Sequence, residues 1–156
     1  MAGRRTVNAP AAIRAWVAQQ ACRDLVVRAA ACIDMQDYEA FAALFLPDGE
    51  LQRPGDSPLH GRAAILAAYR ARPADRITRH VVTNTRVDLE SESVARVSSL
   101  VLLWSGSRSS AAGPYGRPAQ PRRVLGEFDD RLVQVDEGWR IARRIARFVL
   151  VDEDAR

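Results

Sequence analysis

The sequence predicts a single α+β domain, with helices packed on one face of a strongly curved antiparallel sheet. Three observations support this fold class. The first 70 residues are mostly helical in composition, four long strand-like segments follow residue 76, and short turn signals join these strands in pairs. The 156 residues are 47% hydrophobic, which is enough for one core and requires no second domain. We therefore treat residues 1–156 as one domain.

The N-terminal third predicts two helices behind a flexible arm. The arm is expected over residues 1–10 and ends at Pro10. From Ala11 the composition is helical, but the apolar stripe changes phase between Val17 and Gln20. This change predicts a short first helix, a break, and a longer helix that ends near Asp34.

Two more helices and one short strand are expected before residue 76. Asp37 suits the N-cap of the first of these helices, because its carboxylate can accept a hydrogen bond from the first helical turn. Pro47, Asp48 and Gly49 indicate a turn. The predicted elements are a helix at 38–45, a strand at 50–53 and a helix at 61–70, which Pro73 stops.

The second half of the chain predicts four long strands, at 77–89, 94–104, 124–135 and 139–151. Residues 106–121 are rich in Gly, Ser, Ala and Pro, and we expect a long mobile loop there, either plainly flexible or a lid over a pocket. The alternation in strand 77–89 is imperfect. Either both sheet faces are covered, one by helices and one by another subunit, or a bulge near Asn84 switches the phase.

Charge and hydropathy exclude several classes of protein. The net charge is +4, but all basic residues are arginines spread along the chain among 19 acidic residues, which does not favour nucleic-acid binding. The apolar run 100–104 is far shorter than the roughly 20 residues that span a bilayer. No membrane partner and no signal peptide are predicted, and the expected location is the cytoplasm.

The cysteines and histidines predict neither a disulfide nor a metal site. Cys22 and Cys32 lie ten residues apart on a helix, about 15 Å along its axis, so they cannot bridge each other. The two histidines and these cysteines do not have metal-ligand spacing. The sequence also lacks a glycine-rich phosphate loop after a strand, and no cofactor is expected.

Several segments, in the right order over residues 20–150, resemble the nuclear transport factor 2-like superfamily and its SnoaL-like branch, which includes scytalone dehydratase and bile acid 7α-dehydratase. The resemblance implies a cone-shaped α+β barrel, also called cystatin-like, with a cavity at its wide end. The segments that carry it are 32–38, 44–49, 61–65, 78–84, 126–132 and 138–141.

The resemblance implies a catalytic pair. In the dehydratases of this superfamily an Asp near the end of the long helix orients a His on the first long strand, and Asp34 and His80 occupy the matching places. A carboxylate bonded to one ring nitrogen fixes the tautomer, so that the other nitrogen can remove a proton next to a carbonyl. The competing interpretation is a structural pair without turnover.

Four further residues are expected to bind the substrate. Arg143 is the candidate that steadies an enolate or an anionic group, unless it pairs with Asp130 on the neighbouring strand, and Arg144 replaces it if the last strand bulges. Asn84 and Asp130 are placed in the pocket by strand alternation, although Asn84 also suits a bulge. Phe128 stands where many relatives carry a tyrosine.

These expectations define a cofactor-free lyase, isomerase or cyclase that acts by dehydratase-like proton transfer. Its expected substrate is a hydrophobic cyclic ketone such as a polyketide, aromatic or steroid-like compound. The alternative is a non-catalytic ligand-binding or oligomer-forming subunit, similar to the small subunits of ring-hydroxylating dioxygenases. Both predict a homo-oligomer, a dimer or trimer, because the outer sheet face is apolar.

Overall fold

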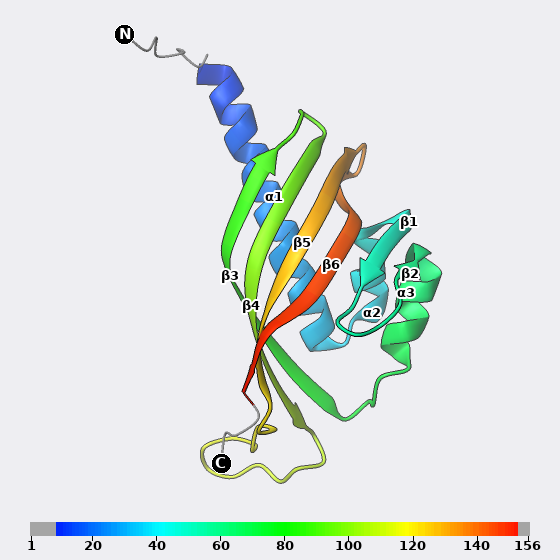
Figure 1. Cartoon of the computed structure of the whole chain (residues 1–156), viewed down its shortest axis with the longest axis vertical. Coiled ribbons are helices and arrows are strands. Elements are labelled where there is room, and N and C mark those ends of the chain that lie inside the picture. Colours follow the sequence, from blue (N-terminus) through cyan, green and yellow to red (C-terminus); the bar gives the residue numbers. More distant parts are fainter. Residues whose placement is uncertain (1–8, 153–156) are drawn as a thin grey trace.

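In the computed structural model, which describes residues 9–152, three helices pack against one curved six-stranded sheet (Figure 1). The predicted α+β class is confirmed. The sheet order is β2-β1-β6-β5-β4-β3, so the sheet stays open, with β2 and β3 at its edges. The helices are α1 (Ala9–Met35), α2 (Tyr38–Ala43) and α3 (Gly61–Arg70), and the strands are β1 (Phe45–Gln52), β2 (Leu59–His60), β3 (Arg76–Leu89), β4 (Val94–Ser107), β5 (Arg123–Val135) and β6 (Gly138–Asp152).

Strands β3 to β6 form consecutive antiparallel pairs, as predicted. The strand at the other side of the sheet differs from the wholly antiparallel expectation, because β1 runs parallel to β6. The N–H of Ile141 donates to the carbonyl of Leu44 at 2.8 Å, which brings the chain alongside β6 as it leaves α2. The first part of β1 includes the predicted turn at Pro47 to Gly49, and a register shift between Phe45 and Glu50 accommodates it.

Helix α1 is continuous, so the predicted break near residues 17–20 is wrong. Its first half is rich in alanine, and no glycine or proline interrupts it after Pro10, so local propensity favours an unbroken helix. The phase change marks the place where the helix leaves the sheet, and its first turns project beyond the strands (Figure 1). Trp16 lies there, 61% exposed, and does not cover the core. Of the predicted arm, residues 1–8 lie outside the described part of the chain.

The local signals for the two short helices are confirmed. The Asp37 side chain accepts a hydrogen bond from the N–H of Ala40 at 3.0 Å and caps α2, which ends two residues before its predicted end. Helix α3 has the predicted bounds. Gly49 lies where β1 and β6 approach closely, because an added Cβ would be 3.0 Å from the carbonyl oxygen of Ile141.

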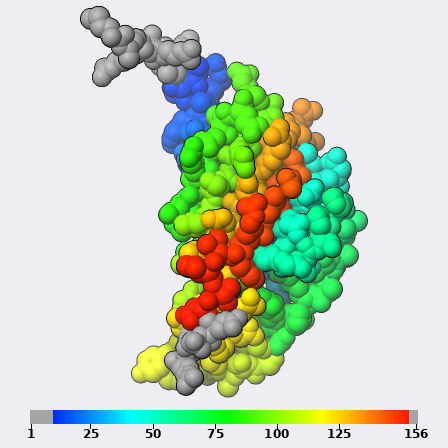
Figure 2. Space-filling model, viewed as in Figure 1, coloured from blue at the N-terminus to red at the C-terminus, as the bar shows by residue number. Residues whose placement is uncertain are grey.

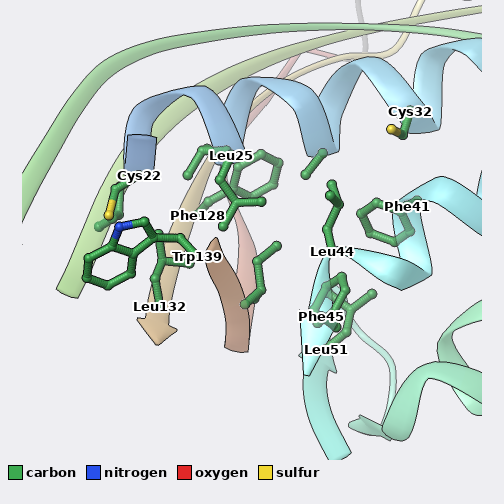
Figure 3. Packing of buried hydrophobic residues seen from close by; sticks show 14 of the residues in the cluster. Cys22, Leu25, Cys32, Phe41, Leu44, Phe45, Leu51, Phe128, Leu132 and Trp139 are labelled. Atoms are coloured by element: carbon green, nitrogen blue, oxygen red, sulfur yellow. The ribbon is translucent and has the colours of Figure 1, made fainter. Parts of the chain in front are cut away.

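The core fills the space between α1, α2 and the inner face of the sheet (Figure 3). Leu25 of α1 packs among Trp139, Leu132 and Phe128 of the sheet, and Phe41 meets Phe45 edge-on with ring centroids 5.3 Å apart. Both cysteines are buried and free. In the part of the chain that the structure describes, no helix is long and apolar enough to cross a bilayer.

The outer face of β3 to β6 is not covered by helices in the view of Figure 2. One row of directly paired residues crosses all four strands on this face, and three of its four members are exposed. The row is Val81, Leu102, Leu125 and Leu150.

The segment between β4 and β5, predicted as a loop, extends beyond the end of the sheet that lies opposite the first turns of α1 (Figure 1). None of its residues lines the cavity beside His80.

Candidate active site

The C-terminal end of α1 is fixed against the start of β3. The helix ends in a Schellman motif, in which the N–H of Asp37 donates to the carbonyl of Cys32 at 2.9 Å and the N–H of Gln36 to that of Ile33 at 3.1 Å. Gln36 adopts the left-handed conformation, with φ 62°, that glycine usually supplies there. Its side-chain amide donates to the carbonyls of Ala74 and Arg76, at 3.2 and 2.8 Å. These bonds hold the last turn of α1 beside β3.

A bulge in β3 sets which of its side chains face inward. Before the bulge, Thr78 and His80 share the inner face, and after it the inward positions are odd-numbered, as at Val87. The register with β4 shifts between Thr83 and Arg86, and Asn84 has φ 52°. The bulge that the imperfect alternation suggested is therefore present, and it explains why no single alternation fits the whole strand.

Asp34 and His80 are brought together at the end of α1. Oδ1 of Asp34 lies 2.6 Å from Nδ1 of His80 and accepts a hydrogen bond from the Thr78 hydroxyl at 2.9 Å, while Oδ2 accepts from the backbone N–H of His80 at 2.8 Å. The side chains of Asp34 and His80 are only 13% and 11% exposed. With an ionised Asp34, Nδ1 carries the proton, and a neutral ring keeps a lone pair on Nε2.

Two opposing effects act on the Asp34 carboxylate. Burial works to raise its pKa. The hydrogen bonds from the side chain and backbone of His80, together with its charge and the Thr78 hydroxyl, outweigh burial, and the pKa of Asp34 is lowered from its ordinary value of 3.8. The carboxylate is therefore ionised at neutral pH and available to orient the imidazole.

A cavity of about 140 Å³ lies beside His80, between the inner sheet face, α1, α2 and the end of α3. Its apolar walls include Ile33, Phe41, Val101 and Phe128. No Asp or Glu is among the described residues that line it, whereas five arginines do: Arg53, Arg72, Arg76, Arg144 and Arg147.

Arg144, and not Arg143, faces this cavity. The pairing of β5 with β6 shifts register between Arg131 and Leu132, and this bulge reverses the faces of the residues after Ile141. Arg143 therefore lies outside, 53% exposed, with Nε 3.2 Å from a carboxylate oxygen of Glu50. The expectation that Arg143 enters the pocket is wrong for this reason, as is the alternative that it pairs with Asp130. The bulge puts Arg144 in its place.

Asp130 and Arg144 instead form a sealed ion pair. Nε and Nη2 of Arg144 each lie 2.7 Å from a different oxygen of Asp130, and the two side chains are 2% and 0% exposed. Desolvation opposes the charge on Arg144, but the Asp130 carboxylate outweighs it and raises the pKa of the guanidinium. Nη1 of Arg144 is buried and has no hydrogen-bond partner among the described residues.

The structure separates the other predicted substrate-binding residues. Phe128 is buried, lines the cavity, and has its ring 4.5 Å from the Arg144 guanidinium carbon. Asp130 reaches the cavity only through Arg144. Asn84 is exposed at the bulge and does not line the cavity.

Sequence reasoning did not place Tyr69, Thr78 or the remaining arginines in the site. Tyr69 is buried in the cavity wall, with the Arg72 guanidinium carbon 3.9 Å above its ring. Burial raises the pKa of Tyr69 against the lowering influence of Arg72, Arg144 and Arg53, so its hydroxyl stays protonated. The alternation that selected His80 also places Thr78 on the same face, and that signal could have identified it.

A second, larger hollow of about 1080 Å³ lies between the first half of α1 and the nearby strand ends. It is lined by residues such as Val17, Asp24 and Trp139, and by none of the predicted catalytic or substrate-binding residues. The imidazole of His80 and the buried guanidinium groups lie at the smaller cavity.

The fold is a cone-shaped α+β fold. Its helices pack against the inner face of an open curved sheet, and a small cavity lies between them. Residues 13–145 match the model of the SnoaL-like domain, and the chain belongs to this family. The resemblance seen in the sequence is thereby confirmed. No functionally curated protein shows significant sequence similarity to the chain.

Solved structures with this fold include a candidate dehydratase and a dehydrochlorinase. A candidate scytalone dehydratase from Novosphingobium aromaticivorans is 25% identical, over 91% of each chain, with a TM-score of 0.78. A hexachlorocyclohexane dehydrochlorinase is 15% identical, over 89% of this chain and 90% of the other, with a TM-score of 0.75. A nuclear transport factor 2-like protein with a cystatin-like fold, also from N. aromaticivorans, is 24% identical, over 94% and 92%, with a TM-score of 0.70.

Proposed function

We propose that the protein is a cofactor-free lyase or isomerase in which His80 is the general acid and base and Asp34 is its orienting residue. The observation that carries this proposal is the Asp34–His80 bond of 2.6 Å at the wall of a cavity that His80 lines. Membership of the SnoaL-like family and the elimination chemistry named for two structural neighbours support it.

The proposed reaction starts at a carbon next to a ketone. Nε2 of His80 takes the α-proton, the C–H electrons form an enolate, and the ring becomes an imidazolium whose Nδ1–H still bonds to Asp34. The guanidinium groups of the arginines that line the cavity can stabilise the enolate oxygen. If the β-carbon carries a hydroxyl, its C–O bond breaks as the double bond forms, and the imidazolium proton leaves with it as water.

The test measures dehydration of 3-hydroxycyclohexanone by the absorbance of the enone formed, and α-proton exchange of cyclohexanone in D2O by proton NMR. We expect H80A to lose roughly 10²- to 10⁴-fold of the enzymatic rate with little change in melting temperature. H60A is the matched control, because His60 has an exposed side chain and does not line the cavity. An H80A variant that keeps the rate, or that no longer folds, would assign Asp34–His80 a structural role.

We also propose that the chain forms a homo-oligomer through the outer sheet face. The apolar row from Val81 to Leu150 is continuous across four strands, and three of its four members are exposed to solvent in one chain. A second copy of the same face would cover it, and light scattering would then give a mass above the 17.2 kDa of one chain.

A cytoplasmic location, proposed from the sequence, agrees with the two free buried thiols.

A further inference from the structure

Two buried donors on residues that line the cavity beside His80 have no hydrogen-bond partner in the described chain. They are Nη1 of Arg144 and Nε of Arg53, and they are the two buried side-chain polar atoms without a hydrogen-bond partner among the described residues. Both residues line the same cavity. A buried donor without a partner costs on the order of 1 to 3 kcal/mol, and more when it is charged. Two such donors at one cavity indicate a ligand that accepts from both.

The charge around the cavity is also incompletely balanced. Asp130 neutralises Arg144, and Asp56, on the outside, lies 2.9 Å from Nη2 of Arg53. Arg72 and Arg76 form no ion pair with a carboxylate in the described part of the chain, although both line the cavity. An excess of guanidinium charge around apolar walls suits a ligand that has an anionic group on a hydrophobic body.

The size of the cavity limits that body. A cavity of about 150 Å³ in another protein holds one benzene molecule, and pockets for drug-sized ligands start near 300 Å³. The 140 Å³ found here therefore fits one six-membered ring, and a fused steroid or an extended polyketide exceeds it.

We propose that the substrate is a monocyclic compound with an anionic substituent, a carboxylate or an equivalent oxyanion, which accepts hydrogen bonds from Nη1 of Arg144 and Nε of Arg53. The ring lies between Phe128, Val101 and His80, with its reacting carbon at Nε2 of the imidazole. This inference rests on the proposed function, because it takes the cavity beside His80 as the substrate site. It narrows the substrate class from hydrophobic cyclic ketones in general to small acidic ones.

The experiment compares sodium benzoate with benzamide by isothermal titration calorimetry at constant ionic strength. The two probes have nearly the same shape, but only benzoate is charged. We expect benzoate to bind at least about tenfold more tightly than benzamide, which is the lower end for a charged hydrogen bond. A steroid carboxylate such as cholate should not bind. Equal affinity for benzoate and benzamide, or binding of cholate with the affinity of benzoate, would overturn the proposal.

Variants locate the binding groups. R53Q should lower the affinity for benzoate about tenfold and leave the affinity for benzamide unchanged. R143Q is the matched control, because it removes the same charge next to Arg144 on a side chain that points away from the cavity. R144Q combined with D130N removes the buried pair without leaving one charge alone, and it should abolish the preference for benzoate in protein that still melts cooperatively. A loss of benzoate affinity in R143Q as large as in R53Q would contradict the assignment.

The failure of this inference and the failure of the proposed function have different signatures. Benzoate binding needs no turnover, so calorimetry and the ketone assays test the two proposals independently. A protein that prefers benzoate but exchanges no ketone protons retains the anion site and loses the catalytic role of His80. A protein that dehydrates 3-hydroxycyclohexanone but binds benzoate no better than benzamide keeps the catalytic role and refutes the anion site.

Discussion

Two carboxylates in the protein pair with cationic or titratable partners that line the same cavity, and the two pairs are built differently. Asp34 and His80 are 13% and 11% exposed and come from the end of a helix and an edge strand. Asp130 and Arg144 are 0% and 2% exposed and come from two adjacent strands within the sheet. Both pairs border the cavity, but the second is almost wholly buried and meets the cavity only through the Arg144 guanidinium.

The difference lies in what each partner can do with a proton. An imidazole held at Nδ1 has a second nitrogen that can take and return a proton, so the Asp34–His80 pair can act chemically. A guanidinium stays charged at every working pH, so the Asp130–Arg144 pair contributes a fixed charge and one NH2 group without a partner, Nη1. Removing the first carboxylate should therefore impair turnover, while breaking the second pair should impair folding.

The largest effect is expected for D34N on the reaction rate. An amide at this position keeps most of the side-chain volume. Both oxygens of Asp34 accept hydrogen bonds from His80, so the NH2 group of Asn would face a donor in either orientation, and the tautomer of His80 would no longer be fixed. We expect kcat to fall roughly 10³-fold, within the usual range for general acid and base catalysis, in a protein that still melts cooperatively. The rate of 3-hydroxycyclohexanone dehydration measures this. Wild-type kcat in D34N would show that the carboxylate does not orient the base.

The next effect concerns the free energy of unfolding. R144M leaves Asp130 buried without its partner, which should cost about 3 to 5 kcal/mol. The double variant R144M with D130L replaces both charges by apolar groups and should recover most of that loss. R143M is the control, because its exposed pair with Glu50 should contribute at most about 1 kcal/mol. Urea unfolding of the three variants measures the comparison, and equal losses in R144M and R143M would refute it.

Sequence reasoning predicted the parts of the fold that depend on local chemistry. The Asp37 cap, the bounds of α3 and the four long strands follow from capping, helix periodicity and hairpin turns, all of which act over a few residues. The parallel pairing of β1 with β6 depends on where the chain returns after α2, which no local pattern encodes.

The candidate site was predictable in part. The pairing of Asp34 with His80 could be predicted because, in the family that the sequence resembles, the end of the long helix contacts the first long strand. Arg143 is predicted in preference to Arg144 only if β6 has no bulge, and the bulge between Ile141 and Arg143 reverses the faces of the residues that follow it. Arg53 and Arg72 lie outside the long strands, and only tertiary packing brings them to the cavity.

The smallest effect separates the two pairs by pH. The pKa of Asp34 is lowered in the folded protein from its ordinary value of 3.8, so the carboxylate stabilises the fold fully above that value and loses this contribution as pH falls through the folded pKa. Wild type should therefore lose more stability than D34N between pH 5 and about pH 2, and the difference between their free energies of unfolding should narrow. The other acidic groups titrate in both proteins, so urea unfolding of the two at several pH values isolates Asp34. If the difference in free energy of unfolding between wild type and D34N did not depend on pH, ionisation of Asp34 would not stabilise the fold. The proposed charged hydrogen bond from Asp34 to His80 would then be contradicted.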